Sequence, residues 1–282
     1  MPTASALRIQ IEHDLERRFP AALSSVPHTI SETACTGIAE VDQLLSGGLP
    51  VGAISEITGP VSSGRTSLTL AFLAARTQED RVCAWVDAHD ALDAESAAAN
   101  GVALCQLLWV RCQRRSPVFL TQRQASVHRS PKPNLEANPF TRPNSSRLDY
   151  AHLDQALRAT DLLLQAGGFA AIVLDLGSTA REQGAKIPLA TWFRFRQATD
   201  RTRCSLLVLA QEPLAQSSAA VVLECTPFGT QSGHQTVIGG FAYQVRTGRI
   251  SAHPSGPFIA GQRKPPASTW TANAAWQREA SA

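Results

Sequence analysis

Hydrophobic and polar positions along the chain follow two patterns, which predict two kinds of element. Short runs that are almost wholly apolar and end at a polar residue or glycine indicate buried strands. Such runs lie at 81–88, 105–112, 170–177 and 204–211, and a further run, 219–225, leads toward a hairpin-like pair around 245–250. The segment 53–59 is predicted as a strand from its length and β-branched residues, directly before a glycine-rich loop. Segments with apolar residues three or four positions apart predict helices at 38–48, 65–78, 91–101, 147–168 and 188–200.

The predicted strands alternate with the predicted helices, an order that favours a mainly parallel sheet buried on both faces. We therefore predict an α/β fold in which helices flank one central sheet, with a small β-hairpin extension. The ligand site is expected at the carboxyl ends of the strands. This pattern divides the chain into an N-terminal helix and linker at 1–34, a core at 35–250 and a flexible tail at 251–282.

Both terminal regions contain apolar residues outside this core. Apolar residues recur every four positions between residues 7 and 19, which predicts a short amphipathic helix. The tail is polar and interrupted by prolines, yet it contains Trp270 and Trp276. Two tryptophans in such a segment suggest docking, either on a partner or on the chain's own surface, and the second alternative is slightly favoured.

Composition restricts the class of protein more than it defines a function. The chain has 282 residues, is 44% hydrophobic and carries a formal net charge of +3, so it is long enough for one substantial core. It contains no apolar run of the roughly 20 residues that a membrane span needs. The N-terminus mixes charges with apolar residues, unlike a secretion signal. Its six cysteines are scattered, which favours free thiols in a reducing cytosol over disulfides or a zinc site.

A glycine-rich sequence, "GPVSSGRTS", follows the predicted strand at 53–59 and precedes the helix at 65–78. It matches the phosphate-binding P-loop pattern G-x-x-x-x-G-K-[ST] except that Arg65 stands where the lysine belongs. Arginine keeps the charge but replaces a compact ammonium with a larger planar fork. The candidate nucleotide-binding residues of this loop are Gly59, Pro60, Val61, Ser62, Ser63, Gly64, Arg65, Thr66 and Ser67.

Together, the segments 36–75, 82–110, 153–178 and 206–211 resemble the ATPase core of bacterial RecA. The resemblance implies a single RecA-like P-loop domain that binds ATP with Mg²⁺. In that family, the residue matching Gln211 senses the γ-phosphate, and the residue matching Asp93 contacts adenine. The resemblance further implies Thr66 and Asp175, which ends the predicted strand at 170–177, as the residues around Mg²⁺.

Departures from the RecA pattern are as informative as the matches. The family's signature D-A-E-H-A-L-D reads "DAHDALD" here, so His89 stands where a glutamate activates the attacking water. His89 is either a substitute base, since its ordinary pKa is about 6.5, or the mark of a lost or slow hydrolysis step. Ser96 replaces the aromatic residue that covers the base, and the segment after Gln211 is shorter than RecA's DNA-gripping loop.

Basic residues are concentrated in an insertion at 111–147, where eight arginines and lysines face one glutamate, a net charge of +7. Its length, prolines and composition favour disorder. Such a segment either binds DNA phosphates weakly without reading sequence or is a solvated insertion with no partner. The candidate DNA-binding residues are Arg111, Arg114, Arg115, Arg123, Arg129 and Lys132.

Among RecA relatives of this length, the pattern is similar to the ImuA family of mutasome accessory proteins. That resemblance implies a cytoplasmic factor of damage-induced translesion synthesis, with little or no ATP hydrolysis. The implied partners are an ImuB-like Y-family subunit, a DnaE-type error-prone polymerase, RecA, and weakly bound single-stranded DNA, and a homo-oligomer is also open. The alternatives are a DNA-dependent ATPase or recombinase in which Arg65 and His89 are functional substitutes, and a RecA-like cell-division inhibitor.

Overall fold

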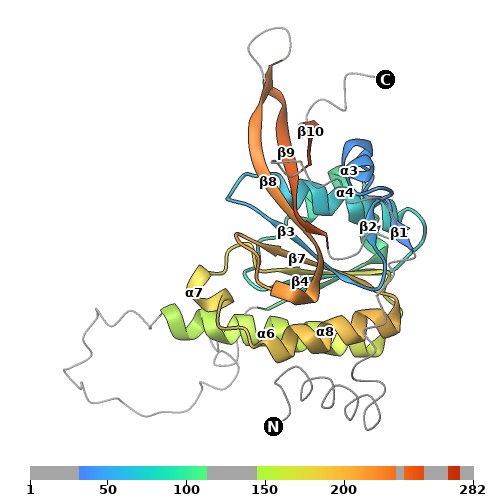
Figure 1. The fold of residues 1–282 in the computed structure, drawn as a ribbon. Coiled ribbons are helices and arrows are strands. Elements are labelled where there is room, and N and C mark those ends of the chain that lie inside the picture. Colours follow the sequence, from blue (N-terminus) through green and yellow to red (C-terminus); the bar gives the residue numbers. More distant parts are fainter. Residues whose placement is uncertain (1–31, 113–144, 233–237, 251–265, 274–282) are drawn as a thin grey trace, which may run out of the picture. The chain divides into compact units, whose positions relative to one another are not determined.

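The computed structural model describes residues 32–112, 145–232, 238–250 and 266–273, all within one compact unit. The predicted N-terminal helix, nearly all of the basic insertion and Trp276 lie outside these residues. Within the described part, an eight-stranded sheet forms the centre of the fold (Figure 1). Across the sheet, the strands are β10 (Ala267–Asn273), β9 (Ile238–Ile250), β8 (Ala219–Ser232), β3 (Ile54–Thr58), β7 (Ser205–Ala210), β6 (Ala171–Asp175), β4 (Cys83–Asp87) and β5 (Leu107–Arg111).

The sheet is parallel from β8 to β5, and β9 and β10 extend it by antiparallel pairing. All five residues of β3, β4 and β6 are buried, as are all six of β7. Burial on both faces explains why β4, β6 and β7 read as nearly continuous apolar runs rather than as alternating ones. The strand β3 is equally buried although Ser55, Glu56 and Thr58 are polar. The predicted α/β fold with a mainly parallel sheet is therefore confirmed.

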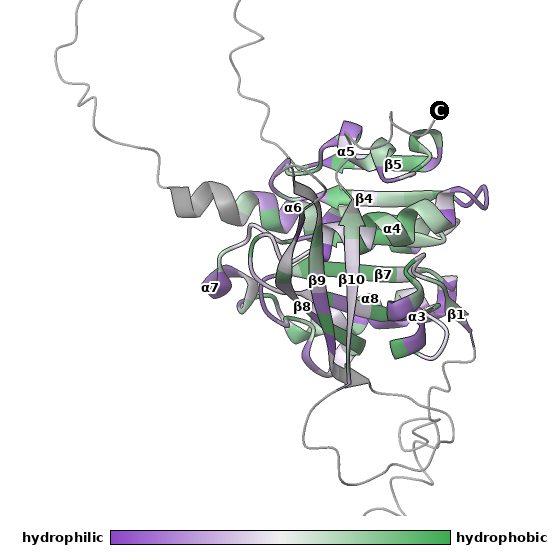
Figure 2. Ribbon diagram, turned by 90° about the horizontal axis from the view of Figure 1, so that it is seen from above, coloured by the Kyte–Doolittle hydropathy of each residue, from purple (hydrophilic) through white to green (hydrophobic). Residues whose placement is uncertain are grey.

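Helices cover both faces of the sheet (Figure 1). One face carries α3 (Ala39–Leu44), α4 (Arg65–Thr77) and α5 (Ala94–Ala99), and the other carries α6 (Ser145–Ala166) and α8 (Leu189–Thr202). Alternate residues of β7 serve the two layers: Leu207 packs with the α4 side, whereas Leu206 packs with Trp192 of α8. The hydropathy colouring in Figure 2 shows β4, β7 and much of α4 as hydrophobic, as burial between layers requires.

The antiparallel part of the sheet differs in detail from the sequence prediction. The hairpin exists, but its strands are β8 and β9, so 245–250 lies inside β9 rather than around a turn. Residues 267–273, placed by sequence in the flexible tail, form β10, in which Trp270 pairs with Tyr243. Trp270 is 5% exposed, which confirms the favoured docking on the chain's own surface. This strand has few apolar residues and is separated in sequence from its pairing partner, so the local sequence pattern did not predict it.

Smaller features complete the described fold. The strands β1 (Thr33–Ala34) and β2 (Leu49–Pro50) form a separate two-stranded sheet, and the short helix α7 (Arg181–Gly184) follows β6. All six cysteines are free; Cys83, Cys112, Cys204 and Cys225 are buried, whereas Cys35 and Cys105 are exposed. No helix in the described part of the chain combines the length and apolar character needed to cross a membrane.

Candidate nucleotide site

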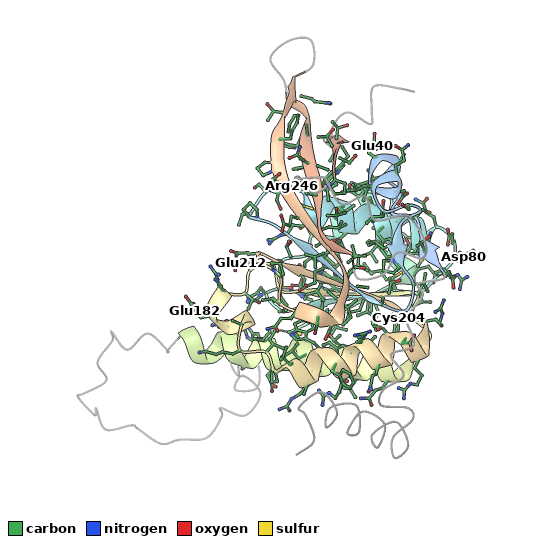
Figure 3. The ribbon with its side chains drawn as sticks, viewed as in Figure 1. Glu40, Asp80, Glu182, Cys204, Glu212 and Arg246 are labelled. Carbon is green, nitrogen blue, oxygen red and sulfur yellow. The ribbon has the colours of Figure 1, made fainter. Side chains whose placement is uncertain are left out.

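The carboxyl ends of the parallel strands all lie at one edge of the sheet, where the sequence places the ligand site. Figure 3 marks both edges: Glu212 follows β7 and Glu182 belongs to α7, whereas Cys204 and Asp80 lie at the opposite edge, before β7 and β4. The P-loop, residues 59–64, joins the carboxyl end of β3 to α4. The loops after β6, β7 and β4 complete this edge.

Backbone geometry of the P-loop fits the binding of an anion. Gly64, the residue before α4, has φ of +87°, and Gly59 has φ of +148° with its α-carbon so close to β8 that a side chain would collide with the Cys225 carbonyl. No side chain caps the amino end of α4, and its first turn contains no acidic residue. Amides at an uncapped helix start attract negative charge. The Ser63 hydroxyl is 99% buried within the loop and has no hydrogen-bond partner among the described residues, so a phosphate oxygen would satisfy it.

The Arg65 side chain is bonded to backbone carbonyls at the carboxyl ends of three strands. Its Nη1 donates hydrogen bonds to the carbonyl oxygens of Gly59, at 2.6 Å, and Ala210, at 2.7 Å. Its Nη2 donates to the carbonyl oxygen of Gly177 at 3.2 Å. One guanidinium therefore joins the carboxyl ends of β3, β7 and β6. In this conformation Arg65 uses its donors within the protein rather than offering them to a phosphate.

Electrostatics around Arg65 follow from its half-buried position. Loss of hydration lowers the pKa of Arg65, and the negative charge of Asp175 opposes that effect. Asp175 itself is 8% exposed, and burial raises the pKa of its carboxyl to about 6. The backbone N–H of Gly177, which donates to Asp175 Oδ1 at 2.9 Å, counters that rise, whereas the neighbouring charge of Asp87 adds to it. Arg65 thus sits as the counter-charge beside the carboxylate that the RecA resemblance assigned to Mg²⁺.

The loop after β4 is organised by a buried carboxylate. Asp87 is fully buried; its Oδ1 accepts from the backbone N–H groups of His89 and Ala91, and its Oδ2 accepts from Leu92 N–H and the Trp109 indole. These bonds wrap the loop around the side chain. Sequence reasoning did not identify this role, although an aspartate that begins an irregular stretch is a recognised signal for bonding to backbone amides further along.

The remaining predicted site residues occupy different positions. Gln211 follows β7, and its Nε2 donates to the Gly177 carbonyl at 3.2 Å, so it shares that acceptor with Arg65. His89 lies half-buried in the loop after β4. Asp93 is the N-cap of α5, where its carboxylate accepts from the backbone N–H groups of Glu95 and Ser96 and from the Ser96 hydroxyl. The bonds to Ser96 lower the pKa of Asp93.

One aromatic residue near the P-loop had no sequence signal. Tyr243 of β9 lies so close to Gly64 that a β-carbon there would fall 2.6 Å from the ring. Burial raises the pKa of its phenol, and a hydrogen bond with Ser67 opposes the rise. Tyr243 also packs on Trp270, with ring centroids 5.2 Å apart. The antiparallel strands β9 and β10 therefore support the P-loop from one side.

These residues fit ATP with Mg²⁺ only in part. The loop backbone and the Ser63 hydroxyl suit a phosphate group, and Thr66 is exposed in the first turn of α4. Mg²⁺ prefers oxygen ligands and keeps several waters, which Asp175 and Thr66 could complement. Arg65, in contrast, donates to three backbone carbonyls of the protein itself. Among the described residues, no group of three or more His, Cys, Asp or Glu side chains could hold a metal ion.

Of the proposed DNA-binding residues, only Arg111 is described, since the others lie outside the described ranges. Arg111 ends β5, and its guanidinium forms a two-point ion pair with Asp90. It also lies over the Trp109 ring, 4.8 Å from its centroid. The hydrogen bond to Asp90 raises the pKa of Arg111. This arginine is therefore already paired at the point where the basic insertion begins.

The order of the P-loop, the Asp87 loop and the parallel strands can be compared with known families. Residues 5–114 match the family of the RecA N-terminal domain. This part of the chain is therefore similar to the RecA N-terminal domain. The matched range contains β3, the P-loop, α4 and β4, whereas Asp175 and Gln211 lie beyond it. The RecA-like part of the site thus includes the altered Arg65 position itself.

Proposed function

We propose that this protein is a degenerate RecA-like accessory factor of bacterial error-prone translesion DNA synthesis, of the ImuA type. It acts through protein contacts in the cytoplasm, and its P-loop binds ATP weakly or not at all. Its partners are an ImuB-like Y-family subunit and a DnaE-type polymerase, with RecA and single-stranded DNA as further contacts. A homo-oligomer is compatible with this function.

The observation that carries this proposal is the orientation of Arg65. Its two terminal nitrogens donate to the carbonyls of Gly59, Ala210 and Gly177, at 2.6, 2.7 and 3.2 Å. A charge that stabilises a phosphoryl-transfer transition state must be placed on the phosphate oxygens. His89 at the glutamate position, and Asp93 engaged as a helix cap, support the same conclusion.

Nucleotide turnover tests the absence of catalysis. The purified full-length chain is titrated with Mg-ATP in a calorimeter, and hydrolysis is assayed on the same sample with and without single-stranded DNA. We expect weak or no binding and no DNA-stimulated turnover. DNA-stimulated hydrolysis that Arg65→Ala and His89→Ala each abolish would instead establish the ATPase or recombinase alternative.

Partner binding tests the cellular role. The tagged chain is co-expressed with a Y-family-like subunit and a DnaE-type polymerase, each alone and together, and the complexes are analysed by size-exclusion chromatography. We expect a stable complex with the Y-family-like subunit. Binding to a division protein, with none to either polymerase component, would favour the division-inhibitor alternative.

A further inference from the structure

Arg65 connects parts of the chain that are far apart in sequence. Its three acceptors stand 6, 112 and 145 residues away, in the loops after β3 and β6 and at the last residue of β7. Each acceptor is a backbone carbonyl, so the bonds fix the course of the main chain rather than a neighbouring side chain. These three strand ends form the edge of the sheet where a nucleotide would lie.

Space and charge at this position suit the guanidinium. A β-carbon on Gly177 would lie 3.0 Å from Arg65 Nη2 and 3.0 Å from Asp175 Oδ1, so glycine leaves room for both groups beside the main chain. Asp175 supplies an opposite charge, and its carboxylate is in turn held by the Gly177 N–H. The position is therefore occupied by a cation of the protein itself, balanced by the carboxylate that Mg²⁺ would otherwise neutralise.

Lysine could not make the same set of contacts. A guanidinium presents five N–H donors in a rigid plane and can bond acceptors on two sides, whereas an ammonium is a compact point charge on a flexible stem. The acceptors of Nη1 and Nη2 lie at the ends of separate strands, and the fork reaches both at once. Arginine in place of lysine at position 65 therefore changes which groups the cation bonds, as well as the shape of the cation.

We propose that Arg65 is an intramolecular lock, which holds the carboxyl ends of β3, β6 and β7 together and withholds its charge from phosphate. This inference deepens the proposed function, because it rests on a P-loop that does not turn over ATP and gives the reason. Arg65 is a positioning residue: it acts on the loops that would form the site. Opening the lock should weaken the fold and expose the phosphate-binding loop in the same step.

The variant Arg65→Lys tests both consequences. Thermal unfolding and calorimetry are performed on the full chain with Mg²⁺ and inorganic triphosphate, a probe without a base. We expect the variant to unfold about 5 °C lower than the wild type without the probe. We expect it to bind triphosphate about tenfold more tightly, because the competing internal bonds are lost. Arg158→Lys, at an exposed position on α6, is the matched control and should change neither quantity.

The variant Gly177→Ala provides an independent test that leaves Arg65 in place. The added methyl group pushes on the guanidinium and on Asp175, so both effects should appear in the same direction and at smaller size. An Arg65→Lys protein with an unchanged midpoint, or with a lower midpoint but no gain in triphosphate binding, would overturn the lock. Hydrolysis of ATP by the wild type would overturn the proposed function instead, so the two failures can be told apart.

Discussion

Two loops at the same edge of the sheet are held by a single charged side chain, yet in opposite ways. After β4, the anion Asp87 accepts three backbone N–H groups from the residues that follow it, within five positions. At the P-loop, the cation Arg65 donates to three carbonyls, two of which are more than a hundred residues away. Asp87 builds one local loop, whereas Arg65 joins the ends of three strands.

The difference teaches where a nucleotide site can be altered without losing the fold. A local carboxylate that satisfies its own loop is part of the folding pattern, and its loss leaves buried amides unpaired. A long-range cation bonds to the ends of strands that their own backbone pairing already holds, so it can decide the state of the site while the sheet persists. The predictions below measure these two roles against each other.

The largest effect is expected for Asp87→Ala. The substitution leaves three backbone N–H groups and the Trp109 indole without their acceptor, and each orphaned buried donor costs roughly 1–3 kcal/mol before water enters. We expect urea unfolding to show a loss of about 4 kcal/mol in the free energy of unfolding. Asp93→Ala is the matched control, because Asp93 caps two amides on the exposed surface and should cost about 1 kcal/mol. Equal losses would remove the distinction between buried and exposed caps.

Gly64→Ala tests how tightly the P-loop is packed. The change adds left-handed strain at φ of +87° and places a methyl group against the Tyr243 ring. Gly168→Ala introduces the same strain at φ of +84° with nothing within 4 Å, so the pair separates strain from collision. We expect losses of about 3 kcal/mol for Gly64 and about 1 kcal/mol for Gly168. Truncating Tyr243 to alanine should reduce the first loss but not the second; otherwise the ring does not support the loop.

The sequence predicts the parts of this site that depend on local pattern. The strands β6 and β7 are evident from apolar runs, β3 from its β-branched residues and α4 from helical spacing, and so the position of the P-loop follows. Asp93 was expected at adenine from the resemblance and is the N-cap of α5, although an aspartate followed by helix formers is a recognised cap signal. Arg65 shows the limit: spacing fixes its place in the chain, but its acceptors lie 112 and 145 residues away. Tyr243 and β10 were missed for the same reason, because both depend on pairing between distant segments.

Asp175→Asn measures how completely Arg65 compensates the buried carboxylate. The pKa of Asp175 is about 6 in the folded protein against an ordinary 3.8, so the folded state retains a proton that the unfolded chain has lost between these values. Stability therefore falls as pH rises through that window. In buffer with EDTA, we expect the Asn variant to gain up to about 2 kcal/mol over wild type above pH 7, and nothing below pH 4.

Asp154→Asn, an exposed position on α6, is the control for that experiment and should show no such growing difference. A wild type whose advantage increases with pH would mean that the charge of Arg65 stabilises ionised Asp175 more than burial destabilises it. The charge of Arg65 would then stabilise the ionised form of Asp175 as well as hold the P-loop. Arg65 would in that case contribute to the stability of the fold, as Asp87 does.

The smallest expected effect is a change in the order in which the cysteines react with a thiol reagent. Cys112 donates its backbone N–H to the Asp87 carbonyl, whereas Cys225 lies beside the P-loop, its carbonyl close to Gly59. Both are buried, and burial raises their pKa values to about 11 and about 12. In the wild type, a thiol reagent at neutral pH should label Cys35 and Cys105 first, which mass spectrometry of the peptides would locate.

The two variants should then change that order differently. Asp87→Ala should bring Cys112 forward, because the loop that covers it has lost its centre, and should leave Cys225 protected. Arg65→Lys should bring Cys225 forward and leave Cys112 protected, since the lock acts on the P-loop side of the sheet. If both thiols become reactive together in either variant, the two loops open as one unit. Asp87 and Arg65 would then stabilise one cooperative unit at this edge of the sheet.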